Sequence, residues 1–60
     1  MNLDPAQIAE NLILENGVDK AFMIALDVTI DAHAKGDNYL LSVWREVKAI
    51  LGEKKKALAS

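Results

Sequence analysis

The chain has 60 residues, of which 52% are apolar, and its formal net charge at pH 7 is -2. This apolar content excludes intrinsic disorder, and the absence of cysteine excludes disulfides and thiolate zinc sites. A chain this short buries only about 60% of the surface that its unfolded form exposes, so its stability is marginal without further support. Oligomerisation is the source of additional stability that this composition favours.

Nothing in the sequence predicts export or membrane insertion. Residues 1–5, Met-Asn-Leu-Asp-Pro, lack the basic and apolar regions of a secretory signal. No stretch approaches the roughly 20 consecutive apolar residues of a membrane span. We therefore expect one small domain over residues 1–60, located in the cytoplasm.

The first predicted helix covers residues 5–16. Asp4 is placed to cap the free N–H groups of the helix, and Pro5 suits the first helical position. Gln7 occupies the position of a capping-box partner. Gly17 predicts the end of the helix, because glycine readily takes the left-handed conformation that ends many helices.

The second predicted helix, residues 19–35, is apolar over most of its circumference. Its polar stripe is narrow and consists of Lys20, Asp27, Asp31 and Lys35. A helix of this kind has to be buried by more than one neighbour. We therefore expect an all-α, three-helix module in which this helix is central. We also expect two copies to assemble as a homodimeric bundle through the second and third helices.

The third predicted helix covers residues 38–51 and follows a short joint, in which Gly36 is expected to end the second helix and Asp37 to cap the third. Its apolar residues recur at three- and four-residue intervals, which indicates a buried stripe. Gly52 either ends this helix or lies inside one that continues toward Leu58. Residues 53–60, which include three consecutive lysines, are expected to form a frayed basic tail.

The expected dimer or partner interface consists of large apolar side chains of the second and third helices, with the single histidine. These residues are Phe22, Leu26, Ile30, His33, Leu40, Val43, Trp44, Val47 and Ile50. A separate exposed patch for a protein partner is predicted at Tyr39, Leu41 and Arg45, because aromatic and arginine side chains are enriched at interfaces.

The sequence lacks the residue groupings of an enzyme or a cofactor site. His33 has neither a nucleophile nor an orienting carboxylate at a suitable spacing, and we interpret it as a residue of the helix end. Asp27 and Asp31 lie one turn apart, but a hard cation needs more oxygen ligands than two carboxylates supply. We predict no enzymatic activity, no metal and no cofactor. A metal-binding or enzyme subunit that uses these three residues remains an alternative.

The charge distribution argues against nucleic acid as the main partner. Residues 1–52 carry eight acidic and four basic residues, a net charge of -4, whereas residues 53–60 carry one acidic and three basic residues, a net charge of +2. An acidic body with a short basic tail is a poor match for phosphates. A nucleic-acid accessory protein is therefore an alternative. The main hypothesis is a small, non-enzymatic protein-interaction or regulatory module.

Overall fold

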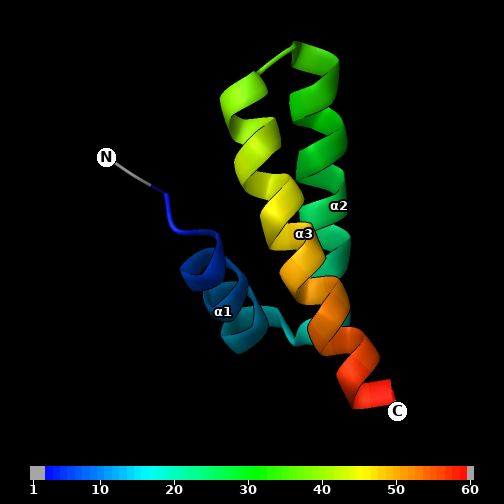
Figure 1. Cartoon of the computed structure of the whole chain (residues 1–60). Helices are drawn as coiled ribbons and strands as arrows, with labels where there is room; N and C mark the ends of the chain where they lie inside the picture. Colours follow the sequence, from blue (N-terminus) through cyan, green and yellow to red (C-terminus); the bar gives the residue numbers. More distant parts are fainter. Residues whose placement is uncertain (1–2, 60) are drawn as a thin grey trace.

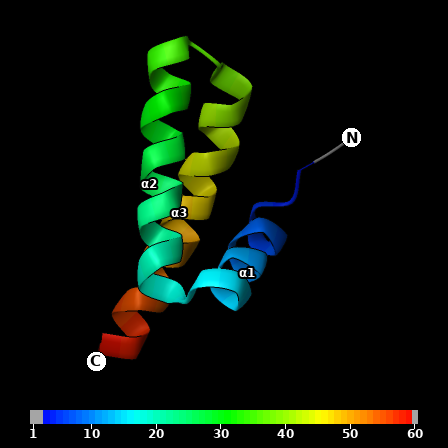
Figure 2. The same cartoon turned by 180° about the vertical axis from the view of Figure 1, so that it is seen from behind.

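The computed structural model describes residues 3–59, and every regular element in that range is a helix. The helices are α1 (Pro5–Asn16), α2 (Val18–Lys35) and α3 (Asn38–Ala59). Figure 1, and Figure 2 from behind, show α2 and α3 side by side as an antiparallel hairpin, with α1 beside the end where α2 begins. Each helix packs against both others, and the α2–α3 contact is the most extensive. The prediction of three packed helices is confirmed.

The start of α1 follows the capping prediction only in part. The Asp4 carboxylate accepts a hydrogen bond from the backbone N–H of Ala6 at 3.0 Å, and Pro5 is the first helical residue. The predicted capping box is wrong, because the Gln7 side chain donates to the Asn11 side-chain oxygen at 3.0 Å. Residues four apart lie on the same face of a helix, so Asn11 offers Gln7 a nearer partner than the helix start.

Gly17 alone joins α1 to α2. Its N–H donates to the Ile13 carbonyl at 2.8 Å, which closes the last turn of α1. Its φ of 83° and ψ of 162° lie in a region that is essentially restricted to glycine, and not in the left-handed helical region that the sequence predicted. The extended ψ lets the chain turn directly into α2, which begins at Val18, one residue earlier than expected.

The turn between α2 and α3 has the predicted form. Gly36 has φ 72° and ψ 22°, in the left-handed region, and the N–H of Asp37 donates to the Ala32 carbonyl at 3.0 Å. The Asp37 carboxylate then accepts from the N–H of Leu40 at 3.1 Å and so caps α3. This short connection places α3 antiparallel to α2.

Small side chains form the buried face of α2. Ala21, Ala25, Thr29 and Ala32 are the buried residues of this helix, and they recur at the spacing of one helix face. The Thr29 hydroxyl donates to the Ala25 carbonyl at 2.7 Å, so the one polar group on this face has a partner. The separation of packed helices depends on the side chains at their contact, and small ones allow a close approach.

The large side chains of the core come from α3. Val47 and Leu51 are the largest side chains that are fully buried in residues 3–59, and Val43 is nearly so. Together with Ala9 of α1 and with Ala21 and Ala25 of α2 they form one cluster. Only two large residues reach full burial, so the core is small.

α3 does not end at residue 51 but continues through Gly52 to Ala59. The predicted end is therefore wrong, and the continuation that the sequence left open is confirmed. Residues 53–59 of the expected basic tail belong to this helix, while residue 60 lies outside the described part of the chain.

The extension of α3 lies against the first turns of α2. The Lys55 ammonium is 3.7 Å from the Asp19 carboxylate and 5.3 Å from the centre of the Phe22 ring. A Cβ atom at Gly52 would stand 3.5 Å from the Phe22 ring, an ordinary van der Waals contact. These contacts give the last turns of α3 a partner on α2.

We expect the Gly52→Ala substitution to stabilise the fold. The site lies inside a helix and has room for a methyl group. Glycine in a helix interior is less favourable than alanine by roughly 0.5–1 kcal/mol, and we expect a gain of that size in the free energy of unfolding. Gly36→Ala is the matched control, because its left-handed φ of 72° should make alanine unfavourable by about 1–2 kcal/mol. Urea titration followed by circular dichroism measures the free energy of unfolding of both variants. Destabilisation by Gly52→Ala would contradict the placement of Gly52 inside α3.

The close contact of α2 and α3 predicts a second pair of results. Ala25→Leu should lower the free energy of unfolding by about 1–3 kcal/mol, because the side chain would be inserted into a filled core. Ala34→Leu makes the same change at an exposed position of the same helix. It should alter the free energy of unfolding by less than about 0.5 kcal/mol. Equal effects in thermal or urea unfolding would show that the Ala21–Ala32 face is not the buried one.

Candidate functional site

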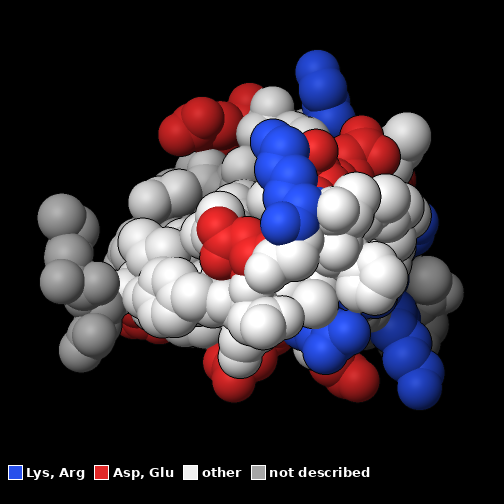
Figure 3. All heavy atoms as spheres, turned by 90° about the horizontal axis from the view of Figure 1, so that it is seen from above, with Lys and Arg blue, Asp and Glu red and all other residues white. Residues whose placement is uncertain are grey.

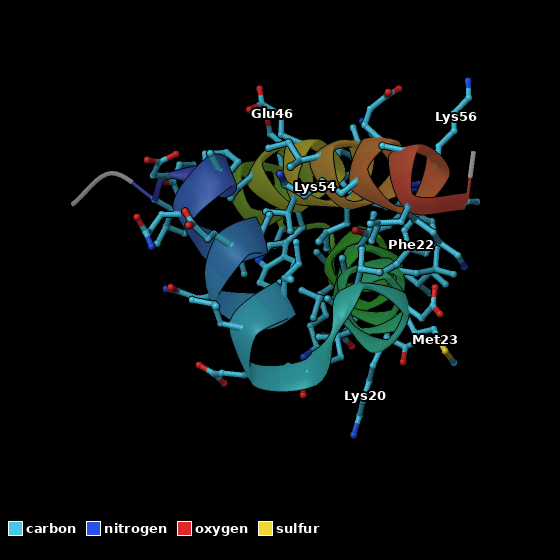
Figure 4. All side chains as sticks on the ribbon, turned by 90° about the horizontal axis from the view of Figure 1, so that it is seen from below. Lys20, Phe22, Met23, Glu46, Lys54 and Lys56 are labelled. Carbon is cyan, nitrogen blue, oxygen red and sulfur yellow. The ribbon has the colours of Figure 1, made fainter. Side chains whose placement is uncertain are left out.

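The large apolar side chains of α2 lie on its exposed side. Met23, Leu26 and Ile30 are 64%, 38% and 59% exposed. Their three- and four-residue spacing places them on one face, as in the seam of a coiled coil. Figure 4 shows Met23 pointing away from α1 and α3, whereas Phe22 lies on the side of α2 toward α3. We call Met23, Leu26 and Ile30 the α2 stripe.

Other exposed apolar side chains lie on separate elements. Leu14 is on α1, Tyr39 is in the first turn of α3, and Leu58 is in its last turn. Apolar residues that are exposed singly are normal on a protein surface, whereas contiguous apolar surface marks interaction sites. The α2 stripe is therefore the candidate site.

The predicted interface residues divide into three groups. Leu26, Ile30 and His33 are exposed. Val43 and Val47 are buried in the core of the chain itself. The half-buried group comprises Phe22, Leu40, Trp44 and Ile50.

Met23 was missing from the predicted interface. The sequence placed it beside the polar stripe of the second helix, where an apolar residue has an ambiguous role. Met23 precedes Leu26 by three residues and Ile30 by seven. This spacing matches the seam positions of a heptad, so it is the sequence signal that places Met23 on the same face as Leu26 and Ile30.

The predicted partner patch at the start of α3 is not one surface. Tyr39 and Arg45 are exposed, but Leu41 is 8% exposed and belongs to the buried residues of α3. Tyr39 instead borders a shallow, open pocket of about 280 Å³ between α3 and the segment that leads into α1. The pocket is lined by Leu3, Pro5, Tyr39, Ser42, Val43 and Glu46.

The titratable residues singled out from the sequence stay exposed and apart. Asp31 pairs with Lys35 at 3.0 Å, and both side chains are more than half exposed. Such a pair contributes about 0.3–0.5 kcal/mol to helix stability. Asp27 and His33 are exposed as well. Within residues 3–59, no three acidic or histidine side chains come together to hold a metal ion.

Basic side chains do not form a separate patch on the face that Figure 3 shows. Figure 3 shows lysine or arginine side chains interspersed with acidic ones on the face seen from above. In Figure 4, Lys54 and Lys56 of the same lysine run point in different directions from α3. Successive helical residues differ in direction by about 100°, so the lysine run spreads around the helix instead of forming a patch.

None of the helices in the described part of the chain is long and apolar enough to cross a membrane. Comparison of the sequence with protein-family models and with curated proteins finds no match, and comparison of the fold with solved structures finds none either.

The exposure of the α2 stripe predicts that the monomer does not need it in order to fold. Ile30→Lys should change the free energy of unfolding by less than about 0.5 kcal/mol, as is usual for exposed positions. Leu51→Ala should lower it by about 2–5 kcal/mol, because Leu51 is fully buried. The measurement is urea unfolding at about 1 µM protein, where association is negligible for a complex with a Kd of tens of micromolar or weaker. A loss with Ile30→Lys as large as that with Leu51→Ala would place Ile30 in the core.

Proposed function

We propose that the chain is a small, non-enzymatic interaction module of the cytoplasm that forms a homodimer and whose working surface is the α2 stripe. The observation that supports this function is the contiguous exposure of Met23, Leu26 and Ile30 at seam spacing. Removing apolar surface from water contributes roughly 25 cal/mol per Å². Three large apolar side chains that are between 38% and 64% exposed therefore supply a driving force for association.

The small core supports the same proposal. Val47 and Leu51 are the only large side chains that are fully buried in the described chain. A second copy that covers the α2 stripe would add buried apolar area that the 60-residue chain cannot provide alone. Any ligand that binds the native state and not the unfolded state raises the free energy of unfolding, and the gain grows with the logarithm of the ligand concentration once that concentration exceeds Kd.

The two alternatives gain no support from the side-chain arrangement. The metal-binding alternative needs Asp27, Asp31 and His33 to converge, but all three are exposed and Asp31 pairs with Lys35. The nucleic-acid alternative needs a basic face, but acidic and basic side chains are mixed on the face that Figure 3 shows.

The size of the stripe sets the expected affinity. A standard stable interface buries about 800 Å² on each partner, with roughly 20–30 residues a side. Three stripe residues and their neighbours are a smaller set, so the dimer should form reversibly in the micromolar range. An equilibrium of this kind suits a regulatory role, because the dimer fraction then follows the concentration of the chain.

The assembly is tested by sedimentation velocity or multi-angle light scattering from about 5 to about 500 µM, a range that spans micromolar dissociation constants. The mass should rise from 6.6 kDa toward twice that value as the concentration increases. The Met23→Lys/Ile30→Lys double variant should stay monomeric over the whole range.

Ala49→Lys/Ala59→Lys is the matched control, since it adds the same two charges at exposed positions of α3 outside the stripe, and it should dimerise like the wild type. A wild-type chain that is monomeric throughout would overturn the homodimer. A Met23→Lys/Ile30→Lys variant that dimerises normally would overturn the assignment of the surface.

A further inference from the structure

We propose that the pocket between α3 and the segment leading into α1 is a second binding site, and that it takes an arginine side chain from an extended segment of a partner protein. The pocket has a volume of about 280 Å³ and is lined by Leu3, Pro5, Tyr39, Ser42, Val43 and Glu46. None of these residues belongs to α2, so the pocket lies apart from the α2 stripe. This inference is therefore independent of the proposed homodimer.

The polar part of the lining is a row of side chains on α3. Tyr39, Ser42 and Glu46 follow one another at intervals of three and four residues, so they lie on one side of the helix. Tyr39 and Glu46 are about 10 Å apart along the helix axis, at a rise of about 1.5 Å per residue. The rest of the lining is apolar and comes from Leu3, Pro5 and Val43. A ligand therefore meets a carboxylate at one end of the row, hydroxyls along it, and apolar surface beside it.

Glu46 gives the pocket its charge. It is the one charged residue among those that line the pocket in residues 3–59, and it is exposed. Figure 4 shows it projecting from α3 on the side away from α2. Within the described residues, its carboxylate takes part in no ion pair and no hydrogen bond. A cation can therefore bind Glu46 without displacing an existing partner.

The elements that border the pocket place no lysine or arginine beside this carboxylate. The residues three and four positions from Glu46 on α3 are all uncharged, and residues 3–17 contain three acidic residues and no lysine or arginine. Arg45 and Lys48 are one and two positions away, so they point about 100° and about 200° around the helix from Glu46. Neither is paired with it. A lining of one sign of charge attracts the opposite sign, so the pocket selects a cationic ligand.

An arginine side chain fits this pocket better than a lysine side chain. The guanidinium can bind a carboxylate through two parallel hydrogen bonds. It is also more weakly hydrated than the lysine ammonium, so it loses less on leaving water. The apolar stem of the side chain can lie along the apolar part of the lining while the charged end reaches Glu46.

The shape of the pocket indicates a segment of a protein instead of a free small cation. Small-molecule pockets enclose most of the surface of their ligands, whereas this one is shallow and open. The hydroxyls of Tyr39 and Ser42 can each donate and accept a hydrogen bond, which suits the N–H and C=O groups of a peptide backbone. The guanidinium is accordingly at Glu46, and the backbone of the partner segment lies along the row toward Tyr39.

Titration with capped pentapeptides, followed by backbone amide NMR spectra of the chain, tests this site. The main probe is acetylated and amidated Gly-Ala-Arg-Ala-Gly, and the amide signals of Tyr39, Ser42, Val43 and Glu46 should shift until they saturate. We expect a Kd of about 1 mM, because one side chain in a shallow pocket buries little area. The same peptide with lysine in place of arginine should bind about threefold more weakly. With glutamine in that place, no saturation should be reached.

Glu46→Gln removes the charge without changing the size of the side chain, at an exposed position. It should weaken binding of the arginine peptide about threefold, a loss typical of an exposed ion pair. Glu53→Gln is the matched control, since it makes the same change at an exposed position of α3 outside the pocket, and it should leave the Kd unchanged. Equal Kd values for the two variants would overturn the site. Signals of Asp27 and Asp31 that shift as much as those of the pocket would also overturn it.

Two further measurements identify the source of the cation and separate this inference from the proposed function. Butylguanidinium, which is the side chain without a backbone, should bind about threefold more weakly than the arginine peptide. Equal affinity would make the pocket a site for small cations and overturn the partner segment. The Met23→Lys/Ile30→Lys variant should bind the peptide as the wild type does, whether or not the wild type dimerises. Loss of peptide binding in that variant would overturn the placement of the site in the pocket.

Discussion

The contact between the small side chains of α2 and the large side chains of α3 determines the rest of this structure. Ala21, Ala25, Thr29 and Ala32 form the buried face of α2, and Val47 and Leu51 of α3 fill the centre of the molecule. A helix has a fixed angle between successive residues, so burying one face fixes the direction of every other side chain. The α2 stripe is exposed because the alanine face is buried.

This arrangement explains how an apolar helix can be central and still leave a large apolar surface in water. The alanines bury little area themselves, and their role is to let α3 approach. Three of the large apolar side chains of α2 then stay exposed, whereas Phe22 packs against the core and lies beside Lys55 of the α3 extension. The exposed α2 stripe and the core are therefore two consequences of one helix orientation.

Much of the fold follows from local sequence signals. Asp4, Pro5, Gly36 and Asp37 act as their residue types predict, and the bounds of α1 and the turn before α3 are correct because caps depend on nearby atoms only. Gly52 was ambiguous, since glycine ends some helices and is tolerated inside others. Its role depends on Phe22 and Lys55, which are contributions from tertiary structure that no local pattern contains.

The site was predicted less well, for a physical reason. The periodicity of α3 indicated a buried stripe, and Val43 and Val47 are buried, but Leu41 was predicted on an exposed patch and is buried as well. The periodicity could not show whether α1 and α2 or a second copy would cover this stripe. On α2, apolar residues occupy so much of the circumference that hydrophobic pattern alone does not orient the helix. The structure buries the alanines of α2 and leaves Leu26 and Ile30 exposed. Which of these faces is buried depends on how closely α3 approaches α2, and this distance is a property of the two packed helices together.

The central claim is that α2 presents its large apolar side chains outward and uses them for association. Methyl NMR spectra recorded on dilution from about 500 to about 20 µM test this most directly, because a dimer with a Kd of about 100 µM changes from mostly associated to mostly dissociated over that range. The account predicts that the methyl shifts of Met23, Leu26 and Ile30 change with concentration while those of Leu14 and Leu58, which are also exposed, stay constant. Stripe shifts that do not depend on concentration, or changes confined to Leu14 and Leu58, would contradict it.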